Sequence, residues 1–350
     1  MKKPTMIDVA KHAGVSQSTV SFVLNNAPIT ISEEAKQRIY NSVKILGYEH
    51  KARTNKKSTE SDEKLIALII PNASNYYYME LIKNIGYFVD KKKYSLLILN
   101  TNRNRKDELY YLNLLYSSKN ITGIIYGFTP SISDFSKVSA RNIPLVVLGE
   151  MDNPTNISLI SLDSRKSGEM VANYLLNLNH KNIVYISSPT QSISLSRARR
   201  LNGIEHAMND KGNLTVLCGN NETEFDNPNY EVSIGYNLTK EYFRQSNMSA
   251  TAFVGANDMV AFGIIKALNE LHVQIPQQAS VCGFDNILFS GLTNPSLTTI
   301  DHCTYSLCSM AVDVLDNKIR QNGQVPSKIN YEPILVVRDS SGPAPDIAIM

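Results

Sequence analysis

Apolar residues in the first fifty positions recur at helical spacing and predict three short helices over residues 1–47. Each helix is bounded by residue types that favour helix ends, a capping side chain at the start and a glycine at the close. These residues are Thr5 (in a capping box with Asp8) and Gly14 for the first helix, Ser16 for the second, and Thr30 or Ser32 and Gly47 for the third.

The second predicted helix lies in VSQSTVSFVLNN and has two unlike faces. One face is an apolar stripe that contains Val20, Val23, Leu24 and Ala27. The other, an arc of about 140°, carries Gln17, Ser18, Ser21, Phe22 and Asn25. A solvated face favours Lys, Glu and Arg, whereas short amides and hydroxyls suit a surface that contacts other donors and acceptors. Helix, glycine turn and helix form a helix-turn-helix, whose second helix lies in the DNA major groove.

The hydrophobic pattern changes at Leu65, after a stretch, residues 49–64, with Ala52 as its one apolar residue. Strand-length runs such as LIALII then alternate with helical runs such as MELIKNIGYFVDKK, in two successive series. This predicts an α/β region of two parallel-sheet lobes, with a ligand at the carboxyl ends of the strands. The predicted parts are a helix-turn-helix domain (1–48), a linker (49–64), a two-lobed domain (65–341) and a frayed tail (342–350).

Charge is distributed unevenly along the chain. Residues 1–57 hold ten basic and four acidic residues, a balance of +6, whereas the remainder holds 25 and 28, a balance of −3. A basic head on a slightly acidic body predicts a polyanion partner for the head. Four cysteines without a CxxC pair suit a reducing compartment. With neither a signal peptide nor a bilayer-length apolar run, we expect a cytoplasmic protein without a membrane partner.

Several blocks of the sequence resemble the lactose-repressor (LacI/GalR) family of bacterial transcription regulators. IDVAKHAGVSQSTVSFVLNN resembles its helix-turn-helix, and ISEEAKQRIYNSVKILGY its third helix. RRLNGIEHAM resembles its RxxG segment, FVGANDMVAFGIIKALNELHVQIPQQASVCGFDN with NPSLTTID its C-terminal block, and PILVVRDSS its final strand. The blocks follow in order over residues 5–341. The resemblance therefore implies a helix-turn-helix domain joined to a two-lobed effector domain like a periplasmic binding protein.

By this resemblance, the second helix is the recognition helix. Gln17 and Ser18 would meet base edges in its first turn, and a Gln amide can bond to adenine through two hydrogen bonds. Phosphate contacts position a protein on DNA without reading its sequence. The resemblance assigns such contacts to Thr5, Ser16, Thr19, Ser21 and Asn25. Helix capping or solvation is the simpler role of each hydroxyl.

Two segments depart from the family pattern. Phe22 stands where the family often has Arg or His, so it either touches a thymine methyl group or packs against the third helix and leaves its base unread. In the linker, His50 takes the place of a proline and Lys57 that of the leucine that wedges between bases. Wedges are apolar, so here we expect Lys51, Arg53 and Lys57 to contact phosphates and make binding salt-dependent.

The resemblance also implies effector-binding residues. Tyr77 and Tyr78 in NYYYMEL match an aromatic element on which a sugar ring can stack, although either could instead belong to the core. Arg200 of the RxxG segment can grip two hydroxyls or a carboxylate. Asn257 in AND and Asp285 in GFDN match the polar pair that lies on the other wall of the family's ligand cleft. Both residue types suit sugar hydroxyls.

Two weaker indications concern the same cleft. Asp163 follows the last strand of the first series and matches an effector residue less well; its alternative role is to pin the crossover between the lobes. Apart from Arg200, the cleft segments show no basic cluster, which favours a neutral carbohydrate over a phosphosugar or nucleobase.

The resulting hypothesis is a repressor of carbohydrate genes that binds palindromic operator DNA as a homodimer and whose affinity a small molecule, a sugar, controls. Leucine heptads that would make a tetramer are absent. One alternative is a regulator of the same fold controlled by a phosphoprotein or a non-sugar ligand, and another is a sugar receptor without DNA function. GxGxxG, GxxxxGK[ST] and HExxH are absent and the histidines are scattered singly, so we expect no enzyme, cofactor or metal site.

Overall fold

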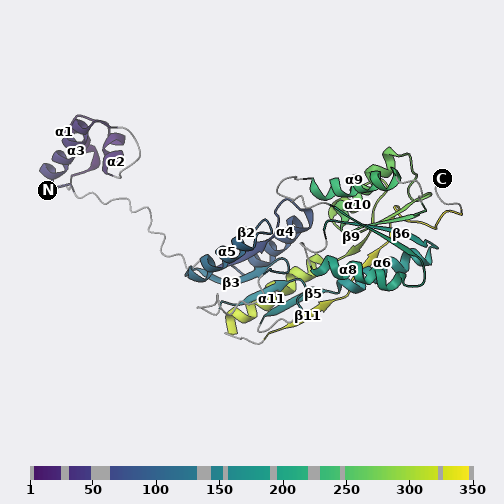
Figure 1. The fold of residues 1–350 in the computed structure, drawn as a ribbon. Helices are drawn as coiled ribbons and strands as arrows, with labels where there is room; N and C mark the ends of the chain where they lie inside the picture. Colours follow the sequence, from purple (N-terminus) through teal and green to yellow (C-terminus); the bar gives the residue numbers. More distant parts are fainter. Residues whose placement is uncertain are drawn as a thin grey trace. The chain divides into compact units, whose positions relative to one another are not determined.

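The computed structural model describes most of the chain. The described segments are residues 4–24, 31–48, 64–131, 143–152, 157–189, 195–219, 229–244, 249–321 and 326–346. The chain divides into two compact units, Met1–Glu63 and Lys64–Met350, the first helical and the second an alternation of strands and helices (Figure 1). Of the predicted linker, only Lys64 lies within the described residues. Among all the residues that the structure describes, no helix is both long and apolar enough to cross a membrane.

Local sequence sets the ends of the helices in the first unit. These helices are α1 (Met6–Ala13), α2 (Gln17–Leu24) and α3 (Glu33–Leu46). The Asp8 backbone N–H donates to Thr5 Oγ1 (3.4 Å), and the Thr5 N–H donates to the Asp8 carboxylate (2.8 Å), as a capping box requires. Ser32, one of the two predicted starts, caps α3. Gly14 and Gly47 end α1 and α3 with φ of 67° and 60°, a conformation that glycine adopts at little cost.

The apolar stripes of the three helices meet in a small core. Its buried members are Val9, Ala10, Ala13, Val20, Val23 and Ile39. Val20 and Val23 turn the apolar face of α2 inward, as its sequence pattern predicts. Gln17 and Ser18, on the opposite face, are exposed.

The first lobe of the second unit is a six-stranded parallel sheet, in the order β11-β5-β4-β3-β1-β2. Along β1, Ile66, Leu68 and Ile70 pack with α4 and α11 on one face, while Ala67 and Ile69 pack with α5 on the other. The elements are β1 (Leu65–Ile70), α4 (Tyr76–Lys91), β2 (Ser95–Asn100), α5 (Arg105–Ser117), β3 (Ile121–Tyr126), β4 (Leu145–Leu148), β5 (Ser158–Leu162), α11 (Thr304–Gln321) and β11 (Lys328–Tyr331).

The second lobe repeats this arrangement, in the strand order β12-β10-β9-β8-β6-β7. Its sheet is parallel except at β12, which pairs antiparallel with β10. The predicted class, a helix-turn-helix domain with two parallel-sheet lobes, is confirmed, with this one antiparallel edge. The elements are α6 (Ser164–Asn177), β6 (Asn182–Ser187), α8 (Leu195–Met208), β7 (Asn213–Cys218), α9 (Tyr230–Arg244), β8 (Ala252–Gly255), α10 (Asp258–Glu270), β9 (Ser280–Asp285), the 3-10 turn η1 (Leu288–Gly291), β10 (Thr298–Asp301) and β12 (Ile334–Val336).

The described elements cross between the lobes at residues 162–164, 301–304 and 331–334. The strand–helix alternation that we predicted from the sequence contains the first of these crossings, but it contains neither α11 nor β11. These two elements return to the first lobe after five strands of the second lobe. α11 has clear helical periodicity, since Leu307, Ala311 and Leu315 are all buried in the first lobe's core. Its position in the first lobe depends on how the chain crosses between the lobes, which the order of the elements along the sequence does not reveal.

The tail that we predicted to fray from residue 342 is anchored where it is described. The Gly342 N–H donates to Ser280 Oγ (3.0 Å), and the Ala344 N–H donates to the Leu178 carbonyl (2.8 Å). His180, fully buried, lies with Nε2 2.9 Å from the Gly342 carbonyl oxygen. The expectation was wrong for residues 342–344, because backbone hydrogen bonds to the second lobe outweigh the local Pro and Gly content; residues 347–350 lie outside the described part.

Two glycines let α6 and α8 pack with their backbones in contact. A Cβ atom added at Gly203 would lie 2.0 Å from the Arg165 carbonyl oxygen, and one added at Gly168 would lie 2.0 Å from the Arg200 carbonyl oxygen. Such distances are far inside van der Waals contact, so any side chain would push the helices apart. The glycine of the RxxG segment therefore sets where the arginine of that segment stands.

We expect Gly203→Ala to lower the free energy of unfolding by about 2 kcal/mol or more, because overpacking a backbone contact costs about 1–3 kcal/mol. Gly86→Ala is the matched control in α4: its added Cβ would lie 3.7 Å from Leu96 Cδ2, an ordinary contact. Replacing a helical glycine there should leave stability unchanged or raise it by about 0.4–1 kcal/mol. Urea unfolding followed by circular dichroism measures both; equal losses in the two variants would contradict the close-packing argument.

Candidate functional site

The predicted DNA-contacting residues lie on and around α2. Gln17 and Ser18 are exposed, Thr19 and Ser21 are half-buried, and the Phe22 side chain is 40% exposed. Gln17, Ser18, Ser21 and Phe22 share the face of α2 that points away from the small core, whereas Thr19 lies at the border of that face, next to the buried Val23. Asn25, Lys51, Arg53 and Lys57 lie outside the described residues, so their contacts with DNA stay predictions.

The hydroxyls at the start of α2 also have a local role. The Thr19 N–H donates to Ser16 Oγ (3.1 Å), so Ser16 caps the start of α2, as predicted. Ser16 Oγ also lies 2.8 Å from Ser18 Oγ and 2.7 Å from Thr19 Oγ1. Thr5 likewise caps α1. Helix capping, the simpler role considered for these hydroxyls, is thus present at Thr5 and Ser16.

A cavity in the second unit lies between its two lobes, next to the carboxyl ends of the strands. Five of the six predicted effector residues line it: Tyr77, Tyr78, Arg200, Asn257 and Asp285. The tyrosines stand in the first turn of α4, after β1, and Asp285 ends β9. The fold thus brings these five together from both lobes, at the position expected for ligands of parallel sheets.

Asp163 is not among the residues that line this cavity. Its side chain is exposed and accepts a hydrogen bond from the Lys166 N–H (2.9 Å), capping α6 directly after the chain leaves the first sheet. Its backbone carbonyl accepts from Ser167 Oγ (2.9 Å). This placement matches the alternative role, fixing the crossover, rather than contact with a ligand.

Arg200 is held from several sides. Its Nη1 donates to the Ala256 carbonyl (2.8 Å), its Nη2 lies 3.1 Å from His302 Nε2, and the guanidinium lies 5.0 Å from the Phe284 ring centroid. Nε is buried and has no hydrogen-bond partner among the described residues.

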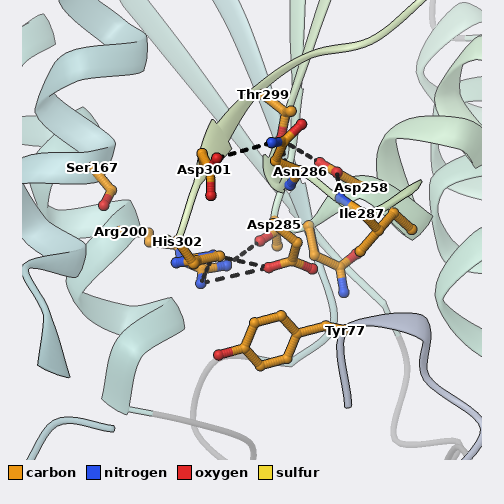
Figure 2. A network of polar contacts seen from close by, with 12 residues as sticks. Tyr77, Ser167, Arg200, Asp258, Asp285, Asn286, Ile287, Thr299, Asp301 and His302 are labelled. Atoms are coloured by element: carbon orange, nitrogen blue, oxygen red, sulfur yellow. Dashed lines mark hydrogen bonds and ion pairs between the residues drawn. The ribbon is translucent and has the colours of Figure 1, made fainter. Parts of the chain in front are cut away.

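Arg200, His302 and Asp285 form a buried polar cluster that Figure 2 shows from close by. Asp285 Oδ1 lies 3.0 Å from His302 Nε2 and 3.9 Å from Arg200 Nη2. A guanidinium can only donate, so the imidazole Nε2 that faces it must accept. The carboxyl group of Asp285 can approach the same nitrogen favourably only if it carries a proton.

The pKa values in this cluster shift in the matching directions. Burial raises the pKa of Asp285 to about 7, against the opposing effect of Arg200. Burial, together with the Arg200 charge, lowers the pKa of His302 to about 3. The imidazole is therefore neutral near pH 7, and Asp285 titrates close to neutrality.

A second buried carboxylate, Asp258, holds the loop that follows β9. It accepts hydrogen bonds from the Ile287 N–H (3.1 Å) and from the hydroxyls of Ser290 (2.5 Å) and Thr299 (2.5 Å), in part visible in Figure 2. Burial raises its pKa to about 6. The loop in turn places Phe289 against Tyr76 of the first lobe, with ring centroids 4.7 Å apart.

Hydrogen bonds and ion pairs on α8 connect the lobes around the cavity. Asn75 of the first lobe donates to Glu231 (2.8 Å), which is also paired with Arg197. Arg199 reaches from the second lobe to Asp152 (2.5 Å) and Glu150 (3.3 Å) of the first. These contacts hold the two lobes in the arrangement that the structure shows.

Sequence reasoning missed several residues that line the cavity. Arg103, Glu150, Arg197 and His302 belong to it. Arg103 and Arg197 thus bring two more guanidinium groups to a cleft for which the sequence led us to expect no basic cluster beyond Arg200. Arg197 could have been found, because it lies three positions before Arg200 and thus on the same helix face. Glu150 and His302 carry no such local signal. In the described segments, no group of three or more His, Cys, Asp or Glu side chains is placed to hold a metal ion.

The raised pKa of Asp285 predicts a pH dependence of stability. Between about pH 4 and pH 7 the native protein keeps a proton that the unfolded chain has released, so the free energy of unfolding should fall as pH rises. The contribution is at most about 1.4 kcal/mol per pH unit. Urea unfolding at a series of pH values should show a flatter profile for Asp285→Asn than for the wild type. Asp90→Asn, at an exposed carboxylate, should keep the wild-type slope; a wild-type slope in Asp285→Asn would contradict the assignment.

Comparison with known proteins identifies both units. The family of bacterial regulatory proteins, lacI family, matches residues 5–50, and a periplasmic binding protein-like domain matches residues 172–341. The HTH-type transcriptional repressor PurR of Histophilus somni (strain 2336) is 29% identical over 340 residues, which cover 96% of this chain and 98% of that protein. Relatives of this kind are named as transcriptional regulators, not as enzymes.

Two similar solved structures contain a sugar. One is a LacI family transcriptional regulator from Enterococcus faecium with bound ribose: 21% identity, TM-score 0.69, covering 80% of this chain and 99% of that one. The other is a periplasmic binding protein/LacI transcriptional regulator from Alkaliphilus metalliredigens complexed with D-xylulofuranose: 25% identity, TM-score 0.68, covering 79% of this chain and 99% of that one. The chain thus combines a lacI-family helix-turn-helix domain with a periplasmic binding protein-like domain, and the relatives that match nearly its whole length are named as transcriptional regulators.

Proposed function

We propose that this regulator represses genes of carbohydrate use and that a sugar bound between the lobes controls its affinity for a palindromic operator. The observation that carries the proposal is the cavity itself, in which Arg200, Asn257 and Asp285 of one lobe face Tyr77 and Tyr78 of the other. Amide, carboxyl and guanidinium groups match sugar hydroxyls, and aromatic rings match the apolar C–H faces of a sugar. The sugars in the two similar structures support this ligand class.

The mechanism couples closure of the cleft to the spacing of two DNA-binding units. A ligand that contacts both lobes changes the balance between the open and closed arrangements of the cleft. The contacts of Arg199 and Asn75 already join the lobes in the arrangement that the structure shows. Coupling free energies of about 1–3 kcal/mol would change operator affinity about five- to 150-fold. A ligand that prefers the DNA-competent arrangement acts as a corepressor, and one that prefers the other arrangement acts as an inducer.

A homodimer is part of this proposal, because two half-sites of a palindrome need two helix-turn-helix units. The first lobe leaves apolar side chains exposed at its β2 edge: Ile98 on the strand itself and Tyr110 and Leu114 on α5. Tyr110 and Leu114 lie one turn apart on the same helix face. Exposed apolar residues at a sheet edge suit an interface with a second copy.

Fluorescence anisotropy on palindromic DNA from the regulator's own promoter tests the function. We expect sequence-selective binding that weakens steeply between 50 and 200 mM salt and that one member of a panel of sugars and sugar phosphates changes by at least about fivefold. Sugar phosphates belong in the panel because Arg103 and Arg197 line the cavity. Arg200→Lys should bind DNA as the wild type does but need about 10- to 100-fold more sugar, the value of one or two charge-assisted hydrogen bonds.

Arg165→Lys is the matched control for this variant, since Arg165 lies in the same lobe and its side chain makes an exposed pair with Glu169 (3.1 Å). It should respond to the sugar as the wild type does. Operator binding that no sugar or sugar phosphate changes would contradict the sugar proposal and favour a non-sugar ligand or a phosphoprotein. Absence of selective DNA binding would contradict the operator proposal and favour a plain sugar receptor.

Removal of residues 1–60 provides a separate prediction. The second unit, Lys64–Met350, is compact by itself and contains every residue that lines the cavity. We therefore expect the truncated protein to lose DNA binding and to bind the sugar with unchanged affinity. Isothermal titration calorimetry measures the latter; loss of sugar binding would mean that the first unit is needed to complete the site.

A further inference from the structure

Phe22 is an aromatic side chain on a helix face otherwise made of amides and hydroxyls. It stands on α2 with Gln17 and Ser18, and its side chain is 40% exposed. The apolar residues Val20 and Val23 of the same helix are buried in the core of the first unit. Within the described residues, Phe22 is not part of that core. The exposed part of the ring is therefore accessible to a partner on the outer side of α2, which contact with a base, one of the two roles open from the sequence, requires.

The position of Phe22 relative to its neighbours on α2 defines what it can meet. Ser18 and Phe22 are four residues apart, so their side chains are adjacent along one face. Ser18 stands in the first turn, where a recognition helix contacts base edges. Phe22 lies one turn further on, so with α2 in the major groove it would face the next part of that groove.

The chemistry of the major groove then restricts the partner of Phe22. A phenyl ring has neither a donor for guanine or adenine acceptors nor an acceptor for their amino groups. Thymine alone among the four standard bases presents an apolar group at that edge, its C5 methyl, and contact with Phe is one of the ways in which proteins read it. Any other base would leave the ring against polar edge atoms and strip them of water without a replacement hydrogen bond.

We propose that Phe22 determines operator specificity by selecting a thymine methyl group in each half-site. The proposal rests on the proposed function, in that α2 must lie in the major groove of operator DNA. It assigns an apolar reader next to the polar readers Gln17 and Ser18, so that the half-site combines one methyl-dependent position with positions read by hydrogen bonds.

The test removes the methyl group alone. With the full-length protein and its selected operator, each thymine of one half-site is replaced in turn by deoxyuridine, which pairs identically but lacks the C5 methyl. We expect one replacement to weaken wild-type binding about three- to tenfold, the effect of losing one buried methyl group. 5-Bromouracil at that position, whose bromine fills the space of the methyl, should restore binding.

Two variants assign the effect to its side chain. Phe22→Ala should bind the thymine and deoxyuridine operators equally well, while Phe22→Leu, still apolar, should keep part of the difference. Gln17→Ala is the matched control on the same face: it should weaken binding to both operators and keep the full methyl effect. Circular dichroism of each variant checks that the helices of the first unit are intact, as expected for substitutions at exposed side chains.

Three results would overturn the assignment. Wild-type protein could bind every deoxyuridine operator as tightly as the thymine operator, or Phe22→Ala could keep the methyl effect. Both results leave the proposed function standing, because selective operator binding is present. No selective binding to any palindrome at low salt would overturn the proposed function and the assignment to Phe22 together.

Discussion

The guanidinium of Arg200 can donate hydrogen bonds but cannot accept them or lose its charge, and much of the second lobe is arranged around that requirement. The Ala256 carbonyl and His302 Nε2 accept from it, Phe284 offers the face of its ring, and Asp285 lies close by. The close packing of α6 on α8 holds the arginine at this point. Burial lowers the pKa of His302, which keeps it neutral as accepting from the arginine requires, and burial also raises the pKa of Asp285 to about 7.

His302 gives this cluster its connection to the first lobe. It lies at the second crossing between the lobes, between β10 and α11, and its ring centroid is 5.6 Å from that of Tyr77. The first two residues of the helix α4 thus contact the second lobe, Tyr77 at His302 and Tyr76 at Phe289. A ligand that displaces one member of the Arg200 cluster acts on groups that already join the lobes, which supplies a physical link between binding and closure.

Much of this organisation could be predicted from the sequence, where the signal is local. Thr5, Gly14 and Gly47 fix helix ends through their own hydrogen bonds and dihedral angles, and the alternation of strands and helices gave the two lobes. The matching of short motifs to a family placed Arg200, Asn257 and Asp285 on one cavity. Such motifs sit at strand ends, whose relative positions follow from the fold class.

The misses have a common cause, which is that they depend on contacts between distant parts of the chain. Glu150 follows β4 and meets Arg199 only because the lobes close on each other. α11 and β11 have ordinary local patterns, yet their place in the first sheet is decided by a crossing. Asp163 looked like a ligand-binding residue because of its position after a strand, whereas its carboxylate is used to cap α6.

That crossing also bears on the order in which the protein is made. The first unit and its three helices leave the ribosome early and form local contacts, so they can fold at once. The first lobe cannot, because α11 (Thr304–Gln321) and β11 (Lys328–Tyr331) are synthesised after most of the second lobe. A nascent chain, or a product cut short before residue 304, therefore carries a finished DNA-binding unit attached to an unfinished effector unit. The cavity between the lobes, and with it the proposed control by a ligand, is complete only when synthesis is nearly finished.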